Sequence, residues 1–351
     1  MGRCPCDLAG TDPSDGQFFV AKKGIFNKNP KVYKTPAEVD ADASGDLADK
    51  LKQALALLPS IGIKGVIQGD FLFGPGDLTK KKIDGESYIT FHPNTIVYAI
   101  PTDQAREVLN AKIGIVWHTS YSGNSFENMT ASYGVNVSSL KKTKAVWSQD
   151  AMLRDVSVAT MTAAETKAVN GYLSDAGKLF QKISSSTLRE LGANPQLQQL
   201  IEQFNNTFVR KGEVIGDPRR HAMALQKWIE RRFKAEKAKR SSDAGKTAQQ
   251  KKMDELLAFF SKDNTASLIA MFDLQKNLVN AKLILMAKLN TLSQIDTFVK
   301  TSKGYQVTGQ EGYVAIDRMS GDAVKLVDRM EFSYNNFSSD IIKGWDSPSR
   351  G

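Results

Sequence analysis

The chain has 351 residues and a formal net charge of +9, from 47 Lys and Arg against 38 Asp and Glu. At about 100 to 200 residues per domain, this length predicts two domains or one domain with a large insert. Hydrophobic residues make up 41% of the chain, which excludes a disordered protein. Because the sequence has no apolar run of about 18 residues, we expect no membrane-spanning helix and no membrane partner.

The first ten residues give little sign of secretion or of a metal centre. Cys4 and Cys6, the only cysteines, are separated by one residue. Two cysteines this close cannot build a disulfide framework or supply four ligands to zinc. The segment also lacks the apolar core of a signal peptide, so we expect a cytoplasmic location.

Composition divides the chain into three segments, 1–150, 151–300 and 301–351. The first contains short β-strand patterns separated by Gly, Pro and Asp turn signals, with one amphipathic helix from Leu47 to Leu58. The third returns to strand patterns. The predicted strands of the first segment are 18–21, 65–73, 88–91, 95–100 and 113–117.

The middle segment reads as an all-helical insert. Thr162 and Glu165 form a capping-box pattern, which marks the start of a helix. Helical periodicity follows, interrupted by Gly/Pro or Ser/Asp clusters. The predicted helices are 162–185, 195–210, 218–240, 251–261 and 264–299.

Positive charge concentrates in one of these helices. Residues 219–240 contain nine Lys or Arg and two acids, a formal +7 (9 − 2), so the rest of the chain is close to neutral. Trp228 and Phe233 lie among the basic residues. They either stack on nucleic-acid bases or form the apolar side of the helix, and in both cases the cations can bind phosphates. We therefore expect this segment to bind a single strand or a nicked end. The candidate contacts are Arg219, Arg220, Lys227, Arg231, Arg232 and Lys234.

A β-hairpin is predicted near the C-terminus, where two apolar strand patterns flank Met319-Ser320-Gly321. A three-residue loop would pair Val314 with Leu326 on an apolar face and would place Glu311 and Lys325 together on the polar face. A four-residue loop would put Lys325 among the apolar residues, at a cost of several kcal/mol for burying an unpaired ammonium, so we expect the three-residue loop. The Glu–Lys pair is either a solvated surface or a phosphate and metal site.

Three further segments carry candidate binding groups. Asp70 follows Gly69 inside an apolar strand, where both residue types are unfavourable; this indicates either a functional site or a buried Asp held by backbone amides. Lys22 and Lys23 end the strand that begins at Phe18, and are either phosphate contacts or a solvated strand end. Tyr98, at the centre of an apolar strand, is either a stacking platform or part of the core.

Together these segments resemble the covalent nucleotidyltransferase superfamily, which contains ATP-dependent DNA ligases, RNA ligases and mRNA capping enzymes. Glu311-Gly312-Tyr313-Val314 resembles its E-G-x-V motif, and Val324-Lys325-Leu326-Val327 resembles the strand whose lysine contacts the α-phosphate. Residues 66–71, Val97-Tyr98-Ala99 and Lys22-Lys23-Gly24 are similar to three further motifs in the correct order. The resemblance covers roughly residues 1–120 and 305–332. The chain is also similar to proteins of T4-like tailed phages that carry this core.

This resemblance implies an α+β fold: an antiparallel-sheet nucleotidyltransferase (ATP-grasp-like) core with a large all-helical insert. It implies ATP and Mg²⁺ as cofactors. In this family's site, Lys325 would bind the α-phosphate, Glu311 the metal or its water, Asp70 the ribose or metal, Tyr98 the purine, and Lys22 or Lys23 a phosphate.

The chain departs from the family at the nucleophile. The family uses the lysine of a K-x-D-G motif upstream of the basic-glycine strand, whereas the first lysine here is Lys22. We expect either truncation inside that motif or loss of covalent catalysis. The resemblance therefore implies an ATP-dependent polynucleotide ligase-like protein, nearer to RNA than to DNA ligases, without its nucleophile. The alternatives are a non-catalytic phage protein that binds a nucleotide or nucleic acid, and a structural phage protein.

Overall fold

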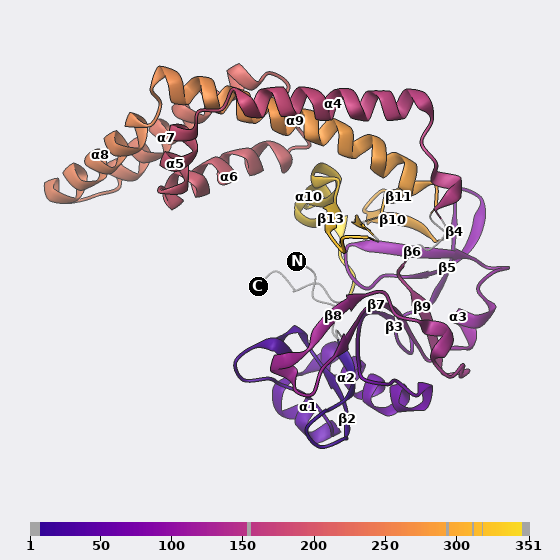
Figure 1. Cartoon of the computed structure of the whole chain (residues 1–351). Helices are drawn as coiled ribbons and strands as arrows, with labels where there is room; N and C mark the ends of the chain where they lie inside the picture. The colour runs from indigo at the N-terminus through magenta and orange to yellow at the C-terminus, as the bar shows by residue number, and fades with distance from the viewer. Residues whose placement is uncertain (1–7, 153–155, 293–294, 311, 318, 346–351) are drawn as a thin grey trace. The chain divides into compact units, whose positions relative to one another are not determined.

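The computed structural model describes residues 8–152, 156–292, 295–310, 312–317 and 319–345 (Figure 1). These residues group into two compact units. The strand unit draws on Met1–Val156, Leu292–Gly309 and Ser339–Gly351, and the helical unit draws on Ser157–Thr291 and Gln310–Ser338. The helical unit thus includes the predicted C-terminal hairpin, which the sequence alone grouped with the strands.

The strand unit contains two mostly antiparallel sheets. In the first, the order is β2-β1-β3-β7-β8, and β9 pairs with β7 in the parallel direction. Residues of α1 (Pro36–Asp42) and α2 (Gly45–Leu57) pack in one buried cluster with Ile67, Phe71 and Trp117 of this sheet. The strands are β1 (Leu8–Thr11), β2 (Phe18–Ala21), β3 (Val66–Phe73), β7 (Ile113–Ser122), β8 (Thr130–Tyr133) and β9 (Val146–Asp150).

The second sheet has the order β11-β10-β6-β5-β4, and the short β14 pairs with β10. The helix α3 (Arg106–Asn110) connects β6 to β7 of the first sheet. The strands are β4 (Thr79–Ile83), β5 (Glu86–Phe91), β6 (Ile96–Pro101), β10 (Asp296–Thr301), β11 (Gly304–Val307) and β14 (Ile341–Ile342).

The strand β10 corrects the sequence analysis, which extended a helix through residue 299. The helix α9 ends at Asn290, and Phe298 pairs with Val97 of β6. Phe298 and Val299 continue the helical spacing of apolar residues, which explains the wrong prediction. The β-branched residues of β10 suit a strand, and pairing with β6 buries Phe298 beside Tyr88.

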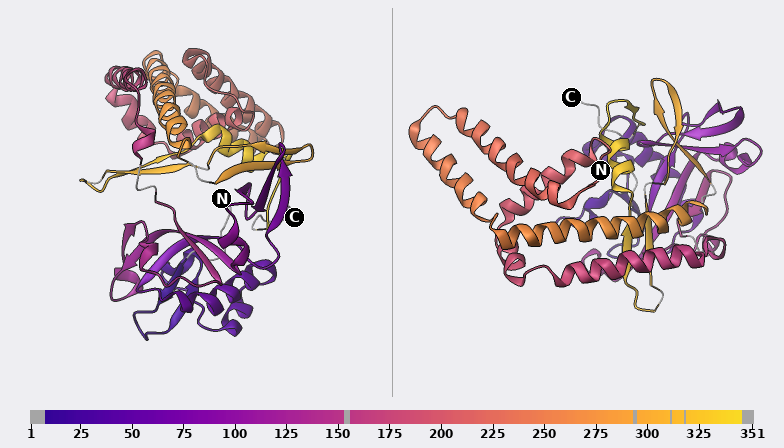
Figure 2. Two further views of the ribbon diagram at one scale, coloured as in Figure 1. Left: turned by 90° about the vertical axis from the view of Figure 1, so that its right-hand side faces the viewer. Right: turned by 90° about the horizontal axis from the view of Figure 1, so that it is seen from above.

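The helical unit contains six helices between residues 157 and 291. Figure 2 shows α4 and α9 lying side by side; an ion pair of 3.0 Å joins Glu165 at the start of α4 to Lys288 at the end of α9, so they run antiparallel. The predicted capping box is confirmed, since Thr162 and Glu165 each bind the other's backbone N–H. The helices are α4 (Ala163–Gln181), α5 (Ser185–Gly192), α6 (Pro195–Val209), α7 (Pro218–Ala238), α8 (Asp243–Ala258) and α9 (Lys262–Asn290).

The C-terminal hairpin has a different register from the predicted one. β12 (Tyr313–Ile316) pairs with β13 (Ala323–Leu326) so that Val314 faces Lys325, which corresponds to the four-residue loop. The prediction assumed that one face of the hairpin is buried. Val314 is instead 51% exposed and Lys325 is also exposed, so this register buries no ammonium. The helix α10 (Arg329–Phe337) follows the hairpin.

The described residues therefore form an α+β fold with antiparallel sheets and a large helical part. None of the described helices is long and apolar enough to cross a bilayer.

Candidate functional site

The helix α7 begins at a sharply defined point. Asp217 is its N-cap, and its carboxylate accepts hydrogen bonds from the backbone N–H groups of Arg219 and Arg220. These bonds, of which that from Arg220 has the larger effect, lower the pKa of Asp217. Pro218 occupies the first helical position, where its missing N–H costs nothing. The cap fixes where the following cations lie around the helix.

One side of α7 belongs to the core of the helical unit. Leu225, Ile229 and Phe233 are buried in a cluster that α6, α8 and α9 share. Trp228 is partly buried against the same cluster, and its ring lies 5.7 Å from that of Phe204. Trp228 and Phe233 therefore belong to the apolar side of the helix and are not placed to stack on nucleic-acid bases.

The opposite side carries a row of exposed cations. At 3.6 residues per turn, five Lys and Arg fall within an arc of about 120° around the helix. With a rise of 1.5 Å per residue, they extend over about 22 Å from residue 219 to residue 234. We call this row the α7 stripe. It consists of the exposed residues Arg219, Arg220, Lys227, Arg231 and Lys234.

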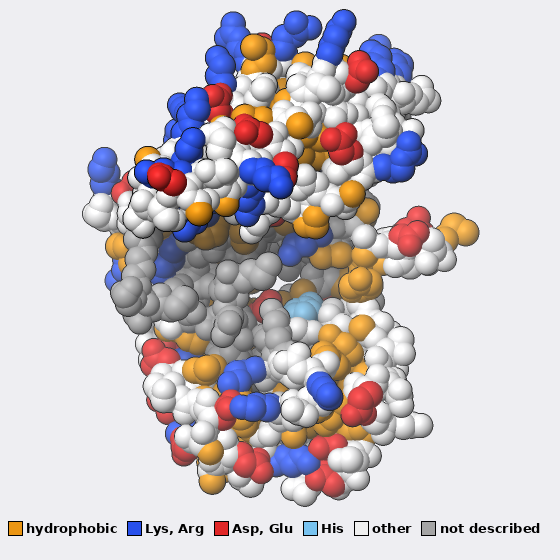
Figure 3. Space-filling model, turned by 90° about the vertical axis from the view of Figure 1, so that its left-hand side faces the viewer, with side chains coloured by type: hydrophobic (Ala, Val, Ile, Leu, Met, Phe, Trp, Pro, Cys, Tyr) orange, Lys and Arg blue, Asp and Glu red, His pale blue; other side chains and the backbone are white. Residues whose placement is uncertain are grey.

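The α7 stripe is only partly neutralised. Lys234 forms an ion pair with Glu230, which lowers the pKa of Glu230, and Arg220 lies 3.5 Å from Asp217. Arg219, Lys227 and Arg231 make no salt bridge to any carboxylate in the described part of the chain. The stripe therefore presents between three and five positive charges to the solvent. In the upper part of Figure 3, many Lys and Arg side chains cover the end of the helical unit that carries α7 and α8.

Arg232 does not belong to the stripe, although the sequence grouped it with the other cations. Its guanidinium lies 5.3 Å from the centre of the Trp228 ring. It also donates to Gln203 at 2.6 Å and pairs with Glu236 at 3.2 Å. Position 232 points toward α6, about 100° around the helix from Arg231. Its role in the structure is to hold α6 and α7 together.

Asp70 lies in β3, opposite Val116 of β7, and is half-buried. Its side chain makes no hydrogen bond or ion pair with any described residue. On the same side of β3, Gln68 accepts a hydrogen bond of 2.6 Å from the Tyr121 hydroxyl. The adjacent Gly69 has a packing role, because a Cβ there would lie 2.7 Å from the Trp117 ring. The glycine is thus explained by the core, whereas Asp70 stays a candidate ligand.

Lys22 is already occupied within the chain. Its ammonium lies 2.8 Å from Asp42 at the end of α1 and 5.5 Å from the centre of the Tyr33 ring. Burial lowers the pKa of Lys22, but hydrogen bonds to Asp42 and Tyr33 outweigh this and raise it. Asp42 also accepts hydrogen bonds from Lys31 and the Tyr33 hydroxyl; the bond from Lys22, together with these two, lowers the pKa of Asp42. A phosphate at Lys22 has to compete with Asp42. The side chain of Lys23 lies outside the described part.

Tyr98 lies in β6 of the second sheet, whereas Asp70 lies in the first. Its ring is stacked on Phe91, with centroids 5.6 Å apart and an interplanar angle of 15°. One face of the ring is therefore covered by the protein. Lys325 is exposed on β13 of the helical unit. Glu311 lies outside the described residues, so the predicted Glu–Lys pair has no observed geometry.

A comparison with protein-family models matches residues 4–341 to a family of unknown function, DUF6267. The chain belongs to this family. No curated protein and no solved structure matches it.

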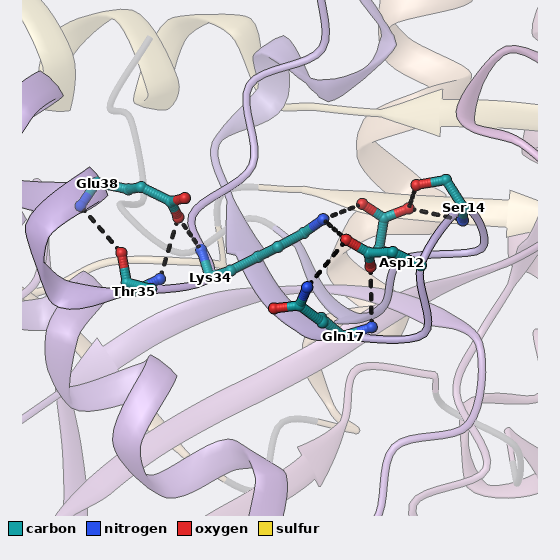
Figure 4. Close-up of polar contacts among 7 residues, drawn as sticks. Asp12, Ser14, Gln17, Lys34, Thr35 and Glu38 are labelled. Atoms are coloured by element: carbon teal, nitrogen blue, oxygen red, sulfur yellow. Dashed lines mark hydrogen bonds and ion pairs between the residues drawn. The ribbon is translucent and has the colours of Figure 1, made fainter.

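Sequence reasoning missed a polar cluster in this DUF6267 protein (Figure 4). The Lys34 ammonium lies 2.6 Å from both Asp12, which is almost fully buried, and Asp15. Burial raises the pKa of Asp12, but hydrogen bonds from Lys34 and Ser14 outweigh it and lower that pKa. The sequence shows a turn signal at Asp12-Pro13, but Lys34, the cation that pairs with Asp12, is 22 residues away along the chain. The cluster ties the β1–β2 turn to the start of α1.

The described residues of this DUF6267 chain contain no group of three His, Cys, Asp or Glu placed to hold a metal ion. Asp70 by itself is a single carboxylate, and Mg²⁺ sites in proteins usually combine one or two carboxylates with substrate phosphates. The described residues therefore do not form a Mg²⁺ site independent of a bound nucleotide.

Proposed function

We propose that the protein binds nucleic acid through the α7 stripe. The observation that carries this proposal is the division of α7 into a buried apolar side and an exposed row of five cations about 22 Å long. Lys and Arg rows bind phosphates, and the release of condensed counterions supplies most of the affinity of such contacts. A net charge of +7 between residues 219 and 240 makes this row the main positive feature of the chain.

Charge reversal on the stripe tests the proposal. The double variant Lys227→Glu, Arg231→Glu removes two cations that have no carboxylate partner among the described residues. Each lost phosphate contact lowers log K by about 0.9 at 0.1 M salt, so we expect at least a 50-fold loss of affinity for a labelled polynucleotide.

The matched control is Lys167→Glu, Lys178→Glu on the exposed side of α4. Each double variant lowers the formal charge by 4, from +9 to +5, so the two are matched in net charge; in the control, Lys178 is paired with Asp175 at 3.0 Å, whereas Lys167 makes no salt bridge to a described carboxylate. The proposal expects nearly unchanged binding for the control. Equal losses in both variants would show that net charge, and not the α7 stripe, determines binding.

A second candidate function is the ligase-like nucleotidyltransferase, with ATP and Mg²⁺ as cofactors. Two segments that resemble its motifs include the paired strands β12 and β13, and Lys325 is exposed without an ion pair to any described carboxylate. Incubation with α-labelled ATP and Mg²⁺ tests this candidate. Label that stays on the denatured protein would support covalent transfer, and nucleotide binding that is lost in Lys325→Ala without such label would support a non-catalytic site.

A further inference from the structure

We propose that the α7 stripe recognises the phosphate backbone of a duplex in preference to a single strand. This inference rests on the proposed nucleic-acid function and specifies the form of its ligand. It differs from the sequence-based expectation of a single strand or nicked end, which left open whether Trp228 and Phe233 stack on bases or belong to the core.

The first argument is that α7 has no exposed aromatic ring. Proteins that bind single strands combine a positive groove with aromatic side chains on which bases stack, each worth about 1–3 kcal/mol. Phe233 is 3% exposed, and Trp228 is packed between Phe204 and the guanidinium of Arg232. The large apolar side chain exposed along the stripe is Met223, which offers no flat ring. The stripe can bind phosphates but has no platform for bases.

The second argument is charge density. A duplex carries one negative charge per about 1.7 Å of axis, whereas each strand carries one per about 3.4 Å. Along the 22 Å of the stripe, a duplex therefore presents about 13 charges and a stacked single strand about 6. A straight, rigid row of three to five cations gains more binding free energy from a duplex, because the duplex has the higher charge density and is the more rigid of the two. The cap by Asp217 and the packing of Leu225, Ile229 and Phe233 hold the row straight.

The expected preference follows from counterion release. The salt exponent is about 0.9 per contact for a duplex and 0.7 for a single strand. The exponents differ by about 0.2 per contact, so at 0.1 M salt each contact favours the duplex by about 0.2 in log K. For three to five contacts, the affinity for the duplex divided by that for the single strand is therefore about 4 to 10.

The experiment measures binding of the full chain to a fluorescently labelled DNA duplex and, separately, to each of its two strands at the same salt concentration. We expect the duplex to bind about 4- to 10-fold more tightly than either strand. The double variant Lys227→Glu, Arg231→Glu leaves one to three contacts and should reduce this preference to about 1.6- to 4-fold, and the α4 control should keep it unchanged.

The possible failures are distinguishable. Equal or tighter binding of a single strand, still abolished by the stripe variant, would overturn the duplex inference and leave the proposed function intact. Binding of neither form, or binding that the stripe variant does not weaken, would overturn the proposed function itself.

Discussion

His221 makes the stability of the helical unit sensitive to acid. Its side chain is 5% exposed and lies among the rings of Phe204, Phe208 and Phe272. Its Nε2 lies 2.8 Å from the side-chain oxygen of Asn205, to which the neutral ring donates. Burial lowers the pKa of His221 to about 4, because the apolar surroundings disfavour the charged ring.

The sign and size of the effect follow from linkage. In the unfolded chain a histidine has a pKa of about 6.5, so on acidification it takes up a proton before the folded state does. Stability is therefore full above about pH 6.5 and falls as the pH drops toward 4. A difference of about 2.5 units at 1.36 kcal/mol per unit gives a loss of about 3 kcal/mol as an upper value.

The variant His221→Gln isolates this contribution, because glutamine keeps a donor for Asn205 but does not titrate. Urea unfolding of both proteins, followed by far-UV circular dichroism, gives the free energy of unfolding at several pH values. The wild-type value minus the variant value should fall by about 3 kcal/mol between about pH 7 and pH 4. A difference that is constant over this range would refute the argument that His221 is buried in its neutral form.

Three other substitutions test particular contacts. Lys34→Met should lower the free energy of unfolding, measured with urea, by about 1–3 kcal/mol, because it leaves the buried Asp12 without its cation. This loss should become smaller in acid, where Asp12 is protonated and no longer needs a cation. Arg232→Gln should cost about 0.5–1 kcal/mol in thermal unfolding yet leave polynucleotide affinity unchanged; a large loss of affinity would place Arg232 back in the interface. Gly114→Ala should cost about 1–3 kcal/mol in the same assay, because the new Cβ would lie 2.0 Å from the buried Phe73 ring; a neutral result would contradict the packing of β3 on β7.

The parts of the fold that the sequence predicted have strong local signals. The helices α6 and α7 begin at Pro195 and Pro218, as expected from a proline that follows a cap residue. Strands rich in β-branched and aromatic residues, such as β3 and β6, were predicted within one or two residues. These elements carry their pattern in a single short segment of sequence.

The missed elements depend on partners elsewhere in the chain. The edge strand β4 contains Lys80, Lys81 and Lys82, and is a strand because it pairs with β5. Its lysines also protect the edge of the sheet from further pairing. The helix α5 is only eight residues long and was hidden by the Ser/Gly boundaries around it.

For the candidate site, the sequence located the cations but not their surroundings. Charge density alone indicated residues 219–240, whereas separating Arg232 from its neighbour Arg231 required the position of Trp228. The pairing of Lys22 with Asp42 joins residues 20 positions apart through the packing of α1, which the sequence analysis did not predict. The register of β12–β13 was predicted wrongly because Val314 on one face and Val324 on the other are both exposed, so the burial of one apolar face does not select the register there.

The dependence of duplex affinity on salt tests the central claim most directly. For three to five phosphate contacts, the slope of log K against log salt concentration should lie between about −2.7 and −4.5, and Lys227→Gln should reduce its magnitude by about 0.9. A slope near zero, or one that Lys227→Gln leaves unchanged, would contradict a phosphate-binding role for the α7 stripe.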